Sequence, residues 1–111
     1  IIDCTADSNN SGGIRASSGC IIRGNSVDTS LAFPNIILTS YGNRVEGNTC
    51  QRGLFGVQIT GNASDNLIVG NFIQGASNAP LSLGGGSNQV GPVITASGTI
   101  ASNSPWANFS R

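Results

Sequence analysis

Asn43-Arg44-Val45-Glu46-Gly47-Asn48-Thr49-Cys50 is one copy of a pattern that recurs along the chain. Later copies are Asn66-Leu67-Ile68-Val69-Gly70-Asn71-Phe72-Ile73 and Asn88-Gln89-Val90-Gly91-Pro92-Val93, and an earlier copy is Ile22-Arg23-Gly24-Asn25-Ser26-Val27. The aliphatic residues Ile22, Val45, Ile68 and Val90 follow one another at intervals of 23, 23 and 22 residues. A constant interval of this size is typical of a solenoid, in which each repeat forms one coil.

A second repeated pattern runs in phase with the first. Its copies are Ile14-Arg15-Ala16, Ile36-Ile37-Leu38, Val57-Gln58-Ile59 and Leu81-Ser82-Leu83, which begin 22, 21 and 24 residues apart. Each copy places two apolar residues at positions i and i+2, the spacing of a strand with one buried face. Each coil therefore contains at least two short strands.

Stacked coils would bring equivalent residues together at about 4.8 Å, the spacing between paired strands. We expect inner stacks of Ile22, Val45, Ile68 and Val90; of Val27, Cys50, Ile73 and Val93; of Ile14, Ile36, Val57 and Leu81; and of Ala16, Leu38, Ile59 and Leu83. No strand could bury its inner face alone, so the coils would be stable only as a stack.

Asparagines form two further columns in the same register. Asn43, Asn66 and Asn88 precede the first pattern's aliphatic residue, and Asn25, Asn48 and Asn71 follow its glycine. Stacked side-chain amides can form hydrogen bonds from one coil to the next, as they do in cross-β ladders. The preceding Gly24, Gly47 and Gly70 would let the backbone turn a corner without a clash at Cβ. These columns indicate a structural role.

The composition excludes several classes of function. Charged residues make up 9% of the 111 residues, against roughly 25% in ordinary soluble domains, and five arginines balance five acids. With no lysine there is no basic field to attract phosphates, so we expect neither nucleic acid nor a membrane surface as a partner. The chain begins Ile-Ile-Asp without Met or a visible signal peptide, so we expect a fragment or a processed product.

We expect no metal and no cofactor. Cys4, Cys20 and Cys50 have unrelated spacings and are interpreted as small buried residues, with a Cys4 to Cys20 disulfide as the alternative. Asp7, Asn9, Ser11 and Gly12 match the first half of a calcium-binding loop. Ser18 stands where such a loop needs its closing acid, which argues against calcium.

The outward positions of the strands are where a function could reside. Arg23 and Glu46 would lie in register on adjacent coils and form an ion pair. Apolar side chains also point outward, and a patch of this kind indicates either an oligomer contact or a loop folded over it. These candidate contact residues are Ile21, Ile37, Leu67, Val69 and Phe72.

The sequence divides a single domain, residues 1–111, into three parts: an N-terminal coil and loop over 1–13, repeated coils over 14–94, and a cap over 95–111. Trp106 and Phe109 stand in the last six residues, beyond the last coil. An open solenoid end exposes unpaired backbone and apolar side chains, so we expect these two residues to cover it.

Residues 14–94 together resemble the right-handed parallel β-helix proteins, in which the phrase Asn-x-aliphatic-x-Gly-Asn-x-aliphatic recurs once per coil. Cys20 replaces the leading asparagine of the first copy, and the tail Ser104-Pro105-Trp106-Ala107-Asn108-Phe109 looks like the closing segment of many bacterial members. The resemblance implies an all-β fold, a right-handed parallel β-helix of about four to five coils of 22–23 residues with a C-terminal cap. The class includes pectate-lyase-like enzymes, epimerases, phage tailspikes, adhesins and inert stalks, so it does not fix a function.

The inventory of chemical groups argues against catalysis. Glycoside hydrolysis needs two carboxylates at one bond, and only Asp28 and Glu46 would fall on neighbouring coils near one face. A lyase needs a base, and without Lys or His that base would be an arginine or Tyr41, which we interpret as structural. We predict no catalytic residue.

Two hypotheses remain from different classes of function. The first is a non-catalytic structural module, the C-terminal end and cap of a larger surface or phage-tail-type β-helix, acting as a homo-oligomer with a trimer favoured and an extracellular, cell-surface or virion location. The alternative is a polysaccharide-binding module or the remnant of a polysaccharide lyase or epimerase. Its binding residues would be Gln51, Phe55, Gln58, Thr60 and Gln74.

Overall fold

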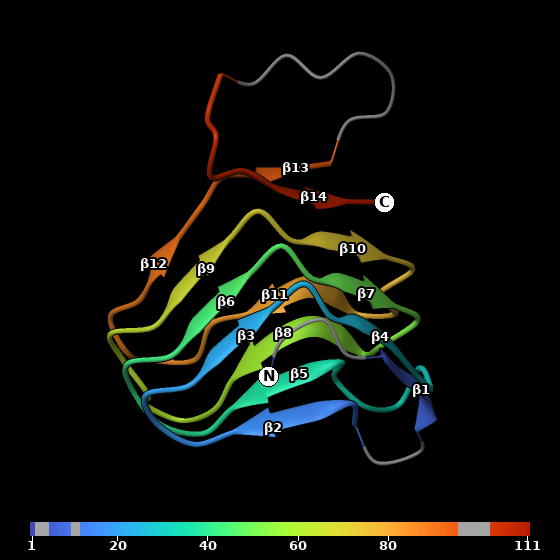
Figure 1. Cartoon of the computed structure of the whole chain (residues 1–111), viewed down its shortest axis with the longest axis horizontal. Helices are drawn as coiled ribbons and strands as arrows, with labels where there is room; N and C mark the ends of the chain where they lie inside the picture. The colour runs from blue at the N-terminus through green and yellow to red at the C-terminus, as the bar shows by residue number, and fades with distance from the viewer. Residues whose placement is uncertain (2–4, 10–11, 96–102) are drawn as a thin grey trace.

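The computed structural model describes residues 1, 5–9, 12–95 and 103–111, with the backbone alone over 5–9. The chain is an all-β parallel solenoid of about three coils (Figure 1). We predicted four to five coils from the repeats. Three coils are complete, and the fourth is incomplete because its last strand does not pair with the third coil. No helix occurs among the described residues.

Each coil passes through three parallel sheets in turn, which we number in the order in which a coil enters them. Sheet 1 contains β2 (Ile14–Ala16), β5 (Ile36–Leu38), β8 (Phe55–Ile59) and β11 (Ala79–Ser82). Sheet 2 contains β3 (Ile21–Arg23), β6 (Arg44–Glu46), β9 (Leu67–Val69) and β12 (Gln89–Val90). Sheet 3 contains, in spatial order, β1 (Thr5–Asn9), β4 (Ser26–Thr29), β7 (Thr49–Gln51), β10 (Phe72–Gln74), β14 (Asn108–Ser110) and β13 (Val93–Ile94).

The predicted inner stacks form the core. Ile22, Val45, Ile68 and Val90 are paired in register along sheet 2, and the first three are fully buried. Ile14, Ile36, Val57 and Leu81 are paired in register along sheet 1, as Figure 1 lets the reader follow from β2 to β11. Cys50 lies in the sheet 3 stack, where burial raises the pKa of its thiol to about 12 and keeps it neutral.

Cys20 and Cys50 are free thiols. Cys20 is half-buried, and its thiol donates to the carbonyl of Ser18 over 3.5 Å. Cys4 and Ser11 lie outside the described residues, and the side chains of Asp7 and Asn9 are not described. The interpretation as a small buried residue is therefore confirmed for Cys50, whereas Cys20 is only half-buried.

Two members of the predicted stacks were wrong. Leu83 is 39% exposed, because it follows β11, beyond which sheet 1 has no further strand. Val93 is 36% exposed and pairs with Asn108 instead of Ile73. The reason for the second error is that the C-terminal strand β14 lies between β10 and β13 and occupies the position expected for Val93.

The asparagine columns form hydrogen-bonded ladders. The backbone N–H and the Nδ2 of Asn48 both donate to Oδ1 of Asn71, each over 3.0 Å, and Asn25 donates to Asn48 in the same way. Asn43, Asn66 and Asn88 form the second ladder, with each internal bond between 2.9 and 3.0 Å. In the first coil Cys20 stands at this position, and its backbone N–H donates to Oδ1 of Asn43 over 3.0 Å. Cysteine has no side-chain amide to donate the second bond.

The first ladder ends on a residue of the C-terminal tail. In the fourth coil Pro92 follows Gly91, so this coil has no asparagine at the ladder position. Asn108 takes that place, and its Oδ1 accepts from the backbone N–H and the Nδ2 of Asn71, each over 3.0 Å. The tail segment 106–109, Trp-Ala-Asn-Phe, is thus equivalent to the segment 69–72, Val-Gly-Asn-Phe.

The glycine corners behave as expected from the sequence, and the tail departs from them. Gly24, Gly47 and Gly70 have φ of 68°, 62° and 64°, the left-handed conformation that favours glycine. Ala107 stands at the equivalent position of the tail and is not among the residues with positive φ. The tail therefore enters sheet 3 without turning the corner that the coils turn.

Replacing Cys20 by asparagine should extend the second ladder by one residue. The new Nδ2 can donate to Oδ1 of Asn43, and we expect the free energy of unfolding in urea to rise by about 0.5–1.5 kcal/mol. Cys20→Asp has almost the same shape without the donor, and should lower stability by placing a carboxylate against that oxygen. Equal stabilities for the two variants would contradict the assignment of Cys20 to this ladder.

Candidate functional site

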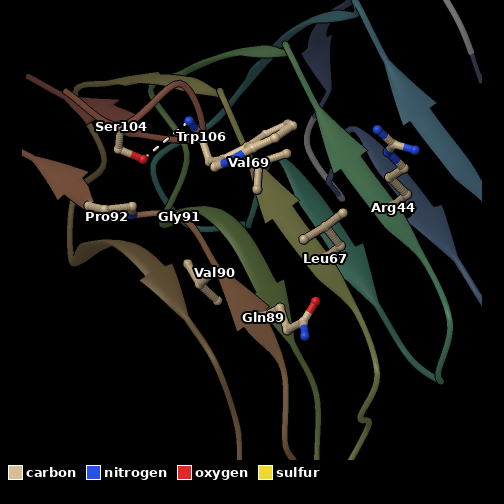
Figure 2. A pocket seen from close by; sticks show the side chains of 9 residues that line it. All are labelled: Arg44, Leu67, Val69, Gln89, Val90, Gly91, Pro92, Ser104 and Trp106. Atoms are coloured by element: carbon tan, nitrogen blue, oxygen red, sulfur yellow. Dashed lines mark hydrogen bonds between the residues drawn. The ribbon is translucent and has the colours of Figure 1, made fainter. Parts of the chain in front are cut away.

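The outer face of sheet 2 has a hollow of about 430 Å³ beside the C-terminal tail (Figure 2). Its floor is formed by outward side chains of β9 and β12, and its far wall by the tail. The lining residues are Arg44, Leu67, Val69, Gln89, Val90, Gly91, Pro92, Ser104 and Trp106. Apolar side chains dominate the floor, while Arg44, Gln89 and Ser104 provide hydrogen-bonding groups at the edge.

Trp106 is held at this wall by its backbone. Its carbonyl accepts from the N–H of Gly70 over 3.2 Å, and its N–H donates to Oγ of Ser104 over 3.3 Å. Gly91 lies so close that an added Cβ would come within 1.8 Å of the Trp106 carbonyl oxygen. Only glycine at position 91 permits this approach of the tail backbone.

The indole of Trp106 lies beside Val69 (Figure 2), and the residue is largely open to solvent. Trp106 is 57% exposed, whereas Val69 is 5% exposed despite its outward position on β9. The aromatic side chain of Trp106 and the aliphatic side chain of Val69 therefore line the hollow side by side. A flat, exposed aromatic ring beside polar groups is a common feature of ligand sites.

Two further hollows continue this one along the strand direction. One, of about 540 Å³, shares Leu67 and Gln89 with it and extends to Asp65 and Ser87, before the strands begin. The other, of about 260 Å³, shares Val69 and Trp106 and extends to Arg23, Glu46 and Pro105. The three together form an elongated groove, which we call the sheet 2 groove.

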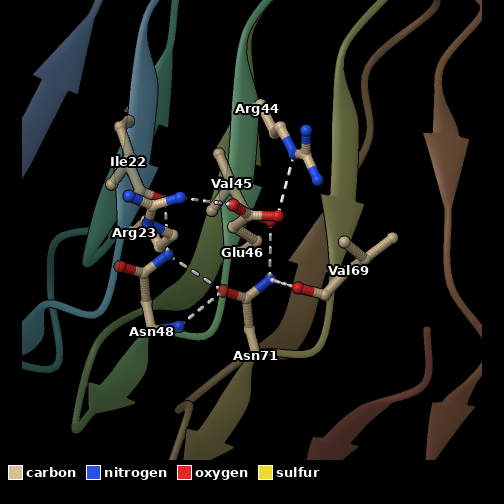
Figure 3. A network of polar contacts seen from close by, with 8 residues as sticks. All are labelled: Ile22, Arg23, Arg44, Val45, Glu46, Asn48, Val69 and Asn71. Carbon is tan, nitrogen blue, oxygen red and sulfur yellow. Dashed lines mark hydrogen bonds and ion pairs between the residues drawn. The ribbon is translucent and has the colours of Figure 1, made fainter. Parts of the chain in front are cut away.

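Three charged side chains lie together toward one end of the sheet 2 groove, and Asp65 lies at the other end. Glu46 accepts from Nε of Arg44 over 2.8 Å, and its other oxygen lies 3.6 Å from Nη1 of Arg23 (Figure 3). The predicted pair of Arg23 and Glu46 is confirmed. Both arginine side chains are about half exposed, so each pair contributes at most about 1 kcal/mol. The cluster carries one net positive charge.

The two acids considered for hydrolysis, Asp28 and Glu46, both form ion pairs with arginines. Asp28 lies on β4 of sheet 3, where Nε of Arg52 donates to Oδ1 over 2.8 Å. Glu46 lies on β6 of sheet 2. The acids therefore belong to different sheets, and each already has a partner. Within the described part of the chain, no cluster of three potential metal ligands occurs and no helix is long and apolar enough to span a bilayer.

The residues predicted to bind polysaccharide come from two faces. Gln51 and Gln74 are paired in register on sheet 3, whereas Phe55 and Gln58 belong to β8 of sheet 1. Thr60 follows β8, and its hydroxyl donates to the carbonyl of Leu38 over 3.3 Å. The structure brings together only the two glutamines and, separately, the β8 residues.

The residues predicted for an oligomer contact lie on all three sheets. Ile21 and Leu67 are on sheet 2 with Arg44 between them, Ile37 is on sheet 1, and Phe72 is on sheet 3 in register with Phe109. Val69 is buried beside Trp106, so a chain segment covers this position, which was the alternative interpretation. The five residues do not share one face.

Sequence reasoning missed the main features of the groove. Gln89 and Ser104 were not selected, and Trp106 was expected to cover the solenoid end. The available signal was the phrase 106–109, Trp-Ala-Asn-Phe, which repeats the aliphatic-Gly-Asn phrase of the coils. That phrase indicates that Trp106 occupies the outward position equivalent to Val69.

The fold and the groove define the class of protein: an all-β parallel β-solenoid with a lateral groove on one sheet. No protein-family model, curated protein or solved structure matches this chain.

A comparison of Val69→Asp with Leu67→Asp tests whether the tail covers sheet 2. The carboxylate at position 69 would be buried without a partner, so we expect the free energy of unfolding to fall by about 3 kcal/mol or more. At the half-exposed position 67 the loss should stay below about 1 kcal/mol. Similar losses at both positions in chemical denaturation would contradict this arrangement.

Proposed function

We propose that this chain is a non-catalytic structural module that forms the end of a parallel β-helix, and that its C-terminal tail terminates the stack. The observation that supports the proposal is the position of Asn108. Its buried side chain completes the ladder that begins at Asn25, although it comes from outside the coil order. A strand in this position takes the place where another coil would pair with β10.

The hydrogen bonds of the tail support a terminating role. Phe109 N–H donates to the carbonyl of Asn71 and Arg111 N–H to that of Ile73, both over 2.8 Å. These bonds pair the β10 edge, which would otherwise be a template for another chain, and β13 becomes the outermost strand of sheet 3. The parallel β-helix resemblance supports the same interpretation. The homotrimer remains a prediction. The residues proposed for its contact lie on three different sheets.

Asn108→Ala tests this role. The variant leaves the two Asn71 donors without their acceptor, and we expect the free energy of unfolding to fall by about 2–4 kcal/mol. We also expect the mass in light scattering to rise with concentration above that of the wild type, because the β10 edge opens. Asn78→Ala, at an exposed asparagine, is the matched control. An Asn108→Ala protein as stable and as monodisperse as the control would refute a terminating role.

A second candidate function is the binding of a neutral saccharide chain in the sheet 2 groove. The specific observation in its favour is the exposed indole of Trp106 with Arg44, Gln89 and Ser104 at the same hollow. A sugar ring has an apolar face of C–H groups that can pack on an indole, and hydroxyls at its edge that need hydrogen-bonding partners. The elongated shape of the groove suits a linear oligomer.

Titration of short neutral oligosaccharides against the fluorescence of Trp106, the only tryptophan, tests this candidate. Gln89→Ala should weaken binding about tenfold, corresponding to a loss of about 1.4 kcal/mol. Gln74→Ala, on sheet 3, should leave affinity unchanged and separates this groove from the site expected from the sequence. Loss of binding in Gln74→Ala with retention in Gln89→Ala would place the site elsewhere, and absence of binding by the wild type would reject the candidate.

A further inference from the structure

Strand β14 is the one described strand that lies out of chain order within its sheet. Its neighbours β10 and β13 are both parallel to it. Along the ladders, successive coils bring together residues 22 or 23 positions apart, but Asn71 and Asn108 are 37 positions apart. The segment that completes sheet 3 is therefore inserted between two strands that precede it in the sequence (Figure 1).

The slot between β10 and β13 offers backbone groups over the length of the tail. The carbonyls of Asn71 and Ile73 accept from residues 109 and 111, as described above. On the same side, the N–H of Gly75 donates to the carbonyl of Arg111 over 2.8 Å. On the opposite side, the N–H of Asn108 donates to the carbonyl of Pro92 over 2.7 Å. Any extended segment could use these backbone groups, so they provide affinity without selecting a sequence.

The side-chain contacts of the slot select an asparagine. Asn108 is fully buried, and its Oδ1 accepts the two bonds from Asn71. Its Nδ2 donates to the carbonyl of Ile68 over 3.2 Å and to that of Gly91 over 3.1 Å. An acceptor and a donor are thus required on one side chain of this length. Aspartate lacks the donor and alanine lacks both.

The preceding position selects a small residue. Ala107 is 2% exposed, and the coils have glycine at the equivalent position. The outward neighbour, Phe109, lies in register with Phe72 and is half-buried. The slot therefore recognises an extended segment of the type small residue, then asparagine, then an outward aromatic.

We infer that the slot between β10 and β13 is a strand-acceptor site that also binds the tail, residues 104–111, of a second copy of this chain. Every contact in the slot is non-covalent and is made by groups that the tail itself supplies, so the tail of another copy presents the same groups. The chain has no net charge to oppose such an encounter. Exchange of an identical element between copies requires no new complementary surface. This inference rests on the pairing of β14 and is independent of the terminating role.

The register of Phe72 and Phe109 allows a direct test with the full chain. In a background with Cys4→Ser and Cys20→Ser, one population carries Phe72→Cys and another carries Phe109→Cys. The two are unfolded together, refolded at increasing concentration and oxidised. We expect an interchain disulfide between positions 72 and 109, in an amount that rises with concentration. A chain carrying both substitutions should form the bond within itself at low concentration.

The outcomes separate clearly. Absence of the interchain bond at high concentration, with the intrachain bond formed in the double variant, overturns the inference. Absence of both bonds overturns the placement of β14 itself. In the control, Thr49→Cys replaces Phe109→Cys as the partner of Phe72→Cys. An interchain bond formed equally by the control pair would indicate random contact and would also overturn the inference.

A peptide of residues 104–111 provides the second measurement. Added to the folded Asn108→Ala chain, whose own tail is weakened, the labelled wild-type peptide should bind at least about tenfold more tightly than a peptide with Asn108→Asp. Equal affinities of the two peptides would overturn the selectivity of the slot. If Asn108→Ala does not fold, the cross-linking of otherwise intact chains decides the question.

Discussion

The side chains of the internal asparagines form hydrogen bonds to the coils on both sides, and these bonds hold each coil in register with its neighbours. Oδ1 of Asn48 accepts two bonds from Asn25, while its Nδ2 donates to the carbonyl of Ile22 and to Asn71. Asn66 has the same four-bond arrangement in the second ladder. A buried amide without partners costs about 1–3 kcal/mol, so a shift of one coil against the next would be penalised at every ladder position. The aliphatic stacks supply apolar burial, and the ladders make the register specific.

The repeat was sufficient to predict the inner stacks and both ladders, because residues one period apart must lie on adjacent coils. It could not place the tail. Asn108 is 37 residues beyond Asn71, which is not one repeat interval. The residue just before Trp106, where the repeat has its aliphatic residue, is Pro105. The decisive local feature was Pro92, which removes the ladder amide from the fourth coil and leaves the position for Asn108. The error at Val93 follows from treating this coil as complete, whereas Leu83 is exposed because no strand of sheet 1 lies beyond β11.

The outward residues were harder to predict for a different reason. Alternation within a strand shows that a side chain points outward, but it does not show which neighbouring segment reaches it. Val69 was therefore grouped with Leu67 in one outward patch, with an oligomer contact and a covering loop both left open, and the tail covers the first and leaves the second half-exposed. The sheet 2 groove arises from the same event. The tail forms a wall of two of its three hollows, while the third is lined by the coils alone. The paired tail therefore shapes the part of the groove that contains Trp106.

The most direct test of this account is an NMR measurement of the scalar coupling across the hydrogen bond between the backbone nitrogen of Asn71 and the side-chain carbonyl carbon of Asn108. We predict a detectable coupling, together with slow exchange of the Asn71 N–H with solvent, because the donor and acceptor are both buried and lie 3.0 Å apart. Exchange of the Asn71 N–H as fast as that of an exposed amide, without the coupling, would contradict the claim that the tail completes the asparagine ladder.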